Sequence, residues 1–163
     1  MARNNRDKIY NTPYDDVFKT LLRKCTRLVI PLINEMFGEN YSGDETILQT
    51  SNEYYAGIGE WEDKKIATDS ILTIGAGKNR RYHLECQSDP DGTILVRIFE
   101  YDAQIALDDV TLDKTKSTLI VRLPHTGILY LRNTNNTPSV STIRIESPSD
   151  SMEYKVVSLM VNL

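Results

Sequence analysis

The sequence lacks the features that mark membrane-spanning and secreted proteins. No apolar run approaches the roughly 20 residues that a transmembrane helix needs, and residues 1–7 contain no apolar signal core. The two cysteines, Cys25 and Cys86, have no CxxC motif or histidine partner, so we expect buried free thiols on apolar faces of a helix and a strand. A disulfide or a metal pair is disfavoured. These absences together predict a soluble protein of the cytoplasm that does not contact a membrane.

An excess of positive charge is also missing. The net charge is −4 and the isoelectric point is near 5.2, which argues against a protein that coats nucleic acid generally. The charge is uneven, because residues 1–30 hold seven basic and three acidic residues, a net charge of +4, and leave −8 for the remainder. For any one of these cations, a solvated helix face is the more common role. An acidic remainder still suits a protein that recruits Mg²⁺ to meet phosphate.

Length and composition indicate one compact domain over residues 1–163. A chain of 163 residues can bury a single core, and a hydrophobic content of 40% excludes a wholly disordered chain. No internal repeat or low-complexity tract divides it. The chain is therefore expected to fold as one unit.

The first part of the chain has the apolar periodicity of a helix. Apolar residues recur at steps of three and four over residues 14–36, after an N-cap signal at Thr12 and Pro13. Pro31 removes a backbone donor and crowds the carbonyl four residues back, which predicts a kink or a break between Lys24 and Arg27. Gly38 is expected to end the helical segment.

The middle of the chain predicts a β-hairpin. Residues 68–74 and 81–87 alternate and are rich in β-forming side chains, and residues 75–79 between them have the composition of a tight turn. Residues 48–55 are expected to form a strand before this hairpin. Side chains alternate along a strand, so the second hairpin strand has a polar face and an apolar face. The polar face carries His83, Glu85 and Gln87, and the apolar face carries Tyr82, Leu84 and Cys86.

A second helix is expected over about residues 93–108, followed by strands. Its apolar stripe is Ile94, Ile98, Tyr101 and Ile105, and its polar stripe is Arg97, Glu100, Gln104 and Asp108. Arg97 either binds a phosphate in a bidentate manner or pairs with Glu100 one turn later. Residues 117–124 and 127–132 are predicted strands, and residues 142–147 and 153–161 a last hairpin. The sequence therefore predicts an α/β fold with a mixed β-sheet flanked by helices, in the order α-β-β-β-α-β with an extra C-terminal hairpin.

Two carboxylates can meet at the predicted hairpin. Folding brings Asp69 of the first strand beside Glu85 of the second, on a polar edge that we expect to open to solvent. Two adjacent carboxylates repel each other unless a hard cation neutralises them, and Mg²⁺ is the usual solution. The pair therefore indicates the chemistry of phosphodiester cleavage.

At these residues the chain resembles the PD-(D/E)XK nuclease superfamily. It is most similar to the bacterial group called PD-(D/E)XK nuclease family transposases, which are relatives of the recombination-promoting nucleases. The resemblance extends over most of the chain. It includes TPYDDVFK at 12–19, IPLINEMFG at 30–38, TDS at 68–70, HLECQS at 83–88, VRIFEYD at 96–102 and LYLR at 129–132.

The resemblance implies a restriction-endonuclease-like core and a Mg²⁺-dependent DNA endonuclease tied to a mobile element or to DNA recombination. Asp69, Glu85 and the backbone carbonyl of Cys86 would bind Mg²⁺, for which Mn²⁺ can substitute, and Gln87 would orient the attacking water. Asp16 of the first helix can approach such a metal site, although stabilising the helix dipole is about as common a role for it. His83 lies on the face of Glu85 as an accessory candidate, but a lone strand histidine is more often packed.

Two departures from the family pattern leave a second function open. Thr68 stands where the superfamily name has Pro, and Gln87 stands where it has Lys, so amide dipoles replace a positive charge. The resemblance also implies a helical C-terminal part, which we expect this chain to lack, with natural truncation, decay of a mobile element and an artificial cut as the alternatives. Its apolar stretch at 154–163 favours association, with a homodimer among the outcomes. The alternative function is a catalytically inactive nuclease-fold module that binds nucleic acid or protein.

Overall fold

The computed structural model describes most of the chain. The described residues are 17, 20, 24–50, 53–56, 64–67, 70–75, 80–87, 92–131 and 137–161. In this part of the chain, no helix is long and apolar enough to cross a membrane.

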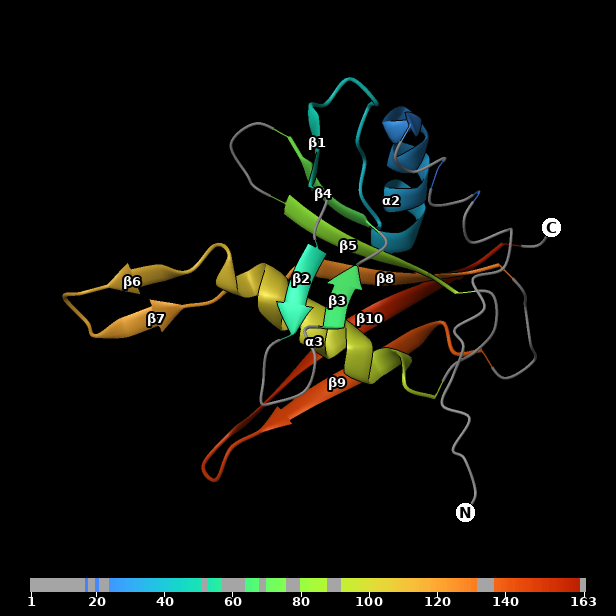
Figure 1. The fold of residues 1–163 in the computed structure, drawn as a ribbon. Helices are drawn as coiled ribbons and strands as arrows, with labels where there is room; N and C mark the ends of the chain where they lie inside the picture. Colours follow the sequence, from blue (N-terminus) through green and yellow to red (C-terminus); the bar gives the residue numbers. More distant parts are fainter. Residues whose placement is uncertain are drawn as a thin grey trace, which may run out of the picture.

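A six-stranded mixed sheet forms the centre of the molecule (Figure 1). Its strands, in spatial order, are β1 (Ile47–Thr50), β4 (Ser70–Ile74), β5 (Arg80–Gln87), β8 (His125–Tyr130), β10 (Ser151–Met160) and β9 (Val140–Glu146). β1, β4 and β5 are antiparallel neighbours. β8 runs parallel to both β5 and β10, and β9 returns antiparallel to β10. The predicted mixed α/β architecture is confirmed.

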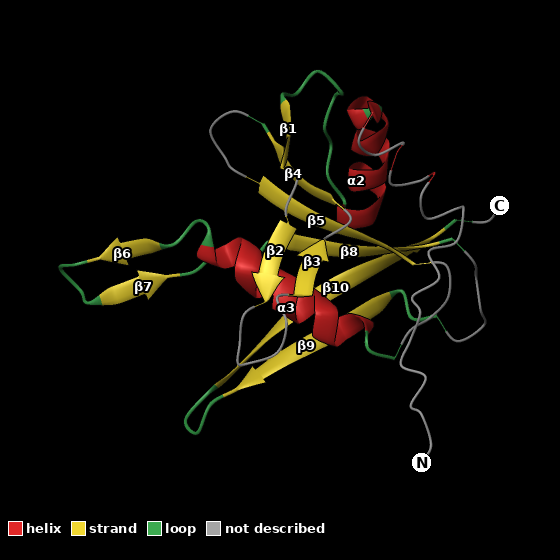
Figure 2. Ribbon diagram, viewed as in Figure 1, coloured by secondary structure: helices red, strands yellow, loops and turns green. Residues whose placement is uncertain are grey.

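The two described α-helices, α2 (Val29–Phe37) and α3 (Ile94–Leu107), cover opposite faces of this sheet (Figure 2). α2 packs on Leu72, Tyr82 and Leu84 in one apolar cluster. α3 packs on the other face, where Ile98 meets Ile128 and Val156. Side chains alternate between the two faces of the sheet along each strand. Each central strand therefore contributes side chains both to the α2 face and to the α3 face, and a helix covers each of them.

The first helical segment breaks where proline predicts a break. Cys25 has no regular structure, and a short 3₁₀ helix, Thr26–Leu28, precedes α2. Pro31 accounts for the break, because its ring leaves no room for an α-helical carbonyl four residues earlier. Gly38 ends α2 in the left-handed conformation, with φ of 66°, and its N–H bonds to the carbonyl of Asn34.

The second helix and both predicted hairpins are confirmed. α3 starts within one residue of the predicted position, and all four residues of its predicted apolar stripe are buried. β4 and β5 form the first hairpin, and β9 and β10 form the last. These elements carry strong local periodicity, and tertiary packing agrees with it.

Three sequence predictions are wrong. Residues 48–55 divide into β1 and β2 (Glu53–Ala56), and β2 pairs with β3 (Lys64–Ala67) in a separate sheet. Residues 117–124 contain only β7 (Thr118–Ile120), which pairs with β6 (Thr111–Asp113) in a hairpin that projects from the main sheet (Figure 1). Cys25 is exposed, because it lies at the helix break and not on the buried face of α2.

The β6–β7 turn has a local cause. The Asp113 carboxylate accepts hydrogen bonds from the backbone N–H of Thr115, at 3.0 Å, and from that of Lys116, at 3.3 Å. These bonds stabilise a turn directly after β6 and make the chain reverse there. A local turn therefore takes residues 118–120 away from the main sheet.

Candidate functional site

The candidate site is built on β5, a central strand with β4 on one side and β8 on the other. The alternation predicted for β5 is confirmed. Tyr82 and Leu84 belong to the apolar cluster under α2, whereas His83 faces α3, where its ring contacts Tyr101 edge-on at 5.8 Å between centroids. Because side chains alternate along the strand, His83 and Glu85 lie on the same buried face of the sheet, the face covered by α3.

His83 lies between two carboxylates. Its Nε2–H donates to Glu85 Oε1 at 3.0 Å, and its Nδ1–H donates to Asp102 Oδ1 at 2.7 Å. The exposed fractions of these residues are 0% for His83, 0% for Asp102 and 5% for Glu85. A single imidazole thus links the strand carboxylate to a helix carboxylate inside the protein.

Asp102 is held from the sheet as well. The Thr126 hydroxyl on β8 donates to Asp102 Oδ1 at 2.9 Å and to Oδ2 at 2.8 Å. The Tyr154 hydroxyl on β10 donates to Oδ2 at 3.2 Å. Both oxygens of this buried carboxylate are therefore hydrogen-bonded, as a charge in the core requires. We call His83, Glu85, Asp102, Thr126 and Tyr154 the buried polar network.

Electrostatics keeps the imidazole charged. Burial alone would lower the pKa of His83, but the hydrogen bonds and negative charges of Asp102 and Glu85 outweigh burial and raise this pKa to about 9. Burial, followed by the charge and hydrogen bond of Asp102, raises the pKa of Tyr154 above its ordinary value. At neutral pH His83 is therefore an imidazolium that donates through both nitrogens, and Tyr154 is a neutral donor.

The burial of Glu85 corrects one expectation. We expected its carboxylate on a polar edge open to solvent, but the residue is only 5% exposed. The physical reason is its position on a central strand, beside His83 and under the layer that holds α3. The shared face with His83 is confirmed, and the open setting of Glu85 is wrong.

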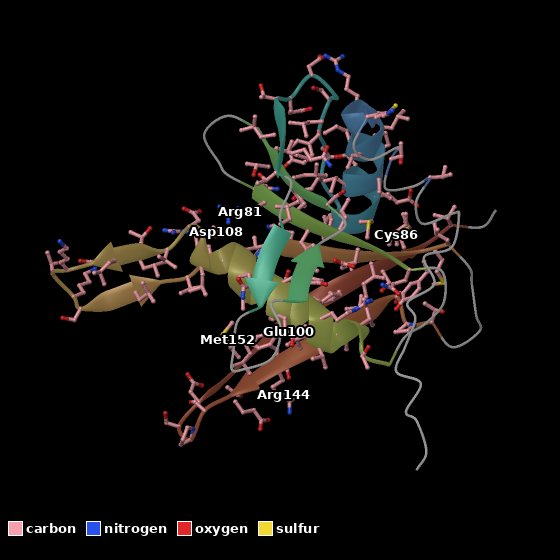
Figure 3. All side chains as sticks on the ribbon, in the orientation of Figure 1. Arg81, Cys86, Glu100, Asp108, Arg144 and Met152 are labelled. Atoms are coloured by element: carbon pink, nitrogen blue, oxygen red, sulfur yellow. The ribbon has the colours of Figure 1, made fainter. Side chains whose placement is uncertain are left out.

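The residues that follow Glu85 complete the end of β5. Cys86 turns to the opposite face and packs with Leu129 and Leu131, which confirms its expected position in the core (Figure 3). Gln87 is half-buried, and its backbone carbonyl accepts a hydrogen bond from Leu131 N–H at 2.9 Å. Arg97 is also half-buried, on α3, five residues before Asp102.

The predicted partner of Glu85 lies outside the described residues. Asp69 and Asp16 are both in this category. The last described pair of the β4–β5 ladder is Ser70 with Leu84, one residue short of Glu85. Within the described residues, no group of three or more His, Cys, Asp or Glu side chains is arranged to hold a metal ion.

Sequence reasoning missed Asp102, Thr126 and Tyr154. For Asp102 a signal was present, because it stands four residues after Ile98 and three before Ile105, on the buried stripe of α3. A carboxylate on an apolar stripe needs a buried partner, and His83 was an available candidate. Thr126 and Tyr154 lie on strands as ordinary β-forming residues, so no local signal distinguished them.

The site joins a buried imidazolium to carboxylates from β5 and α3. Carboxylate oxygens bind hard cations, so Glu85 is chemically suited to contribute to a site for a divalent metal. Comparisons with protein-family models, curated proteins and solved structures found no match.

Proposed function

We propose that this protein is a metal-dependent DNA endonuclease of the PD-(D/E)XK, restriction-endonuclease-like type, associated with a mobile element or with DNA recombination. The observation that supports the proposal is the setting of Glu85. It lies on β5, which is antiparallel to β4 and parallel to β8, and α3 and then the β6–β7 hairpin lie between β5 and β8 along the chain. The resemblance implies this order of elements around its acidic residues.

The register of the hairpin adds support. Ser70 pairs with Leu84, and the next positions outward along the two strands are 69 and 85. Directly opposed residues in an antiparallel pair point to the same face. We propose that the pairing continues by one step, so that the Asp69 carboxylate stands beside that of Glu85.

The donor chemistry suits Mg²⁺. Glu85, Asp69 and the backbone carbonyl of Cys86 are oxygen donors, the type that Mg²⁺ and Mn²⁺ prefer. When bound, the ion would lower the pKa of water and neutralise charge on the phosphodiester. The amide of Gln87 offers donors and an acceptor for orienting a water molecule. Phosphodiester hydrolysis would then depend on positioning and electrostatics, with DNA as the substrate.

One observation favours a second function, a catalytically inactive nuclease-fold module that binds nucleic acid or protein. Glu85 is nearly fully buried and already has a partner in His83, so its carboxylate is hydrogen-bonded without a metal. Gln87 in place of lysine also favours the inactive module, because glutamine carries no positive charge to stabilise a developing negative charge. Such a module would bind DNA, if at all, equally well with and without divalent metal.

Plasmid nicking tests the proposal. Wild-type protein with supercoiled plasmid and Mg²⁺ or Mn²⁺ should yield nicked circles, and Asp69→Asn and Glu85→Gln should not. Glu100→Gln is the matched control, because Glu100 is an exposed carboxylate on α3 (Figure 3). Equal nicking by the wild type and Glu85→Gln would contradict the endonuclease proposal. DNA binding that is indifferent to metal and to Asp69→Asn would favour the inactive module.

A further inference from the structure

We propose that Asp102 and His83 are positioning residues for Glu85: Asp102 fixes the imidazole through Nδ1, and Nε2–H fixes Glu85 Oε1, which leaves Oε2 as the oxygen that binds the metal. This inference rests on the proposed function. The buried polar network then serves to orient one metal ligand, Glu85.

The network is built to hold the imidazole in one orientation. Its two ring nitrogens are engaged at 2.7 Å and 3.0 Å, by carboxylates from α3 and from β5. Asp102 is in turn fixed by Thr126 from β8 and Tyr154 from β10. The orientation of Glu85 is therefore linked to the packing of α3 on three strands of the sheet.

The contact with His83 also restricts the carboxylate of Glu85, because Nε2 of His83 holds Oε1 at 3.0 Å. Because the histidine occupies one oxygen, the carboxylate cannot rotate freely, and ligand geometry is set before the metal arrives.

A purely structural role explains the network less well. Apolar side chains of similar volume usually stabilise a core at least as well as a buried charged group does. β5 uses such side chains on its other face, where Tyr82 and Leu84 pack under α2. Among the described residues of β5, the buried charged side chains stand on the face that carries Glu85. Hydrogen-bonded partners behind a metal ligand are a common requirement of metal sites, and their loss typically weakens metal binding by about 10–100-fold.

Two substitutions at one position separate positioning from packing. In His83→Gln the amide nitrogen reaches about as far as Nε2, so it keeps the donor to Glu85. In His83→Asn the amide reaches only about as far as Nδ1, so it keeps the contact with Asp102 and loses Glu85. Both variants remove the ring and its charge. Loss of the ring and of its charge is therefore shared, and the two variants differ in the hydrogen bond to Glu85 and in one methylene, whose effect on packing the denaturation curves report.

Calorimetric titration with Mn²⁺ alone, together with a denaturation curve for each variant, tests the inference. Wild type should bind Mn²⁺, and Asp69→Asn and Glu85→Gln should abolish binding. His83→Asn should weaken binding by about 10–100-fold, whereas His83→Gln should retain most of the affinity. Glu100→Gln, on the exposed side of α3, should bind as the wild type does.

The outcomes distinguish the inference from the function on which it rests. If His83→Asn binds Mn²⁺ as tightly as the wild type while Asp69→Asn does not bind, the positioning role is overturned and the endonuclease proposal stands. Equal weakening in both His83 variants indicates packing and also overturns it. A wild type that binds no Mn²⁺ overturns both proposals. If His83→Asn does not fold, Asp102→Asn decides, with at least a tenfold loss of affinity in support and unchanged affinity against.

Discussion

The two faces of β5 carry different kinds of buried side chains, apolar on one face and charged on the other. Under α2, Tyr82 and Leu84 join an apolar cluster with Val29 and Ile33. Under α3, His83 forms ion pairs with buried carboxylates. Burying apolar surface is favourable by itself, whereas burying charge is favourable only if every charge finds its partner. The α2 face should therefore tolerate small changes in its apolar side chains. The stability of the α3 face depends instead on every hydrogen bond and ion pair of the buried polar network.

Polar atoms are present on the α2 face too, and they lead from a buried tyrosine to a partly exposed ion pair. The Tyr82 hydroxyl meets the Tyr41 hydroxyl at 2.7 Å and donates to Glu39 at 3.1 Å, and Glu39 forms an ion pair with Arg80. Arg80 is 42% exposed, so water screens this pair. We therefore expect depth, and not polarity alone, to make the α3 network sensitive to substitution.

Removing the carboxylate of Asp102 should have the largest effect. Asp102→Ala leaves the buried imidazolium with one partner fewer and orphans the hydroxyls of Thr126 and Tyr154. We expect the free energy of unfolding to fall by about 3–5 kcal/mol in urea denaturation at pH 7. Glu100→Ala, on the exposed side of the same helix, should change it by less than about 0.5 kcal/mol. Similar losses in both variants would contradict the contrast between the two faces.

Truncating the apolar face should cost slightly less and in a different way. Leu84 is 2% exposed, so Leu84→Ala should lower the free energy of unfolding by about 2–5 kcal/mol through lost burial and a cavity. The loss should be the same at pH 6 and pH 9, because no charge is involved. Leu112→Ala is the control, since Leu112 is 58% exposed on β6. A strongly pH-dependent cost for Leu84→Ala would contradict this expectation.

Stability should depend on pH through His83. Its pKa is raised from an ordinary 6.5 to about 9 in the folded state, so the folded protein holds the proton more tightly. The contribution is complete below pH 6.5 and is lost as the pH rises through 9, a change of roughly 3 kcal/mol. Urea denaturation curves collected over this pH range measure it.

The matched control for this pH dependence is His83→Gln, which cannot titrate. The difference in unfolding free energy between wild type and variant should shrink as the pH rises from 6.5 to 9. A difference that stays constant over this window, or that grows, would show that His83 is not an imidazolium in the folded state.

A smaller effect is expected at Gly127 of β8, which lies against side chains of α2. A Cβ at Gly127 would overlap Cε of Met36 and lie 3.1 Å from Cζ of Phe37. Gly127→Ala should therefore cost about 1–3 kcal/mol by overpacking. Because the nearest atom ends a flexible side chain, a second substitution, Met36→Ala, should show coupling in a double-mutant cycle. If the losses of unfolding free energy in the two single variants simply add in the double variant, Met36 is not the side chain that the added Cβ crowds.

The smallest effect is expected at the surface. Arg144 on β9 (Figure 3) pairs with Glu153 on β10, with Nε to Oε1 at 2.7 Å, and both side chains are about half exposed to water. Arg144→Ala should lower the free energy of unfolding by no more than about 1 kcal/mol, and salt should reduce the difference further. A loss comparable with that of Asp102→Ala would erase the distinction between buried and exposed pairs.

Local patterns in the sequence predicted the local elements. The alternation around Glu85 predicted the β5 strand, the period of α3 predicted its buried stripe, and Pro31 predicted the helix break. Each of these depends on neighbours along the chain. The division of residues 48–55 between two sheets does not, because pairing partners far along the sequence decide it.

The candidate site was only partly accessible to such reasoning. The shared face of His83 and Glu85 follows from the strand period, but their burial depends on the depth of β5 in the sheet. The link to Asp102 spans nineteen residues and forms only when α3 packs on β5. Thr126 and Tyr154 join from strands that lie still later in the chain. Periodicity identifies a face, and tertiary packing selects its partners.

A crystal structure with Mn²⁺ tests the central claim most directly. The account predicts anomalous density for Mn²⁺ bound to Glu85 and Asp69, with the His83 contact to Glu85 Oε1 intact near its present 3.0 Å. Mn²⁺ bound at other residues, or no Mn²⁺ while the His83–Glu85 pair remains closed, would contradict it.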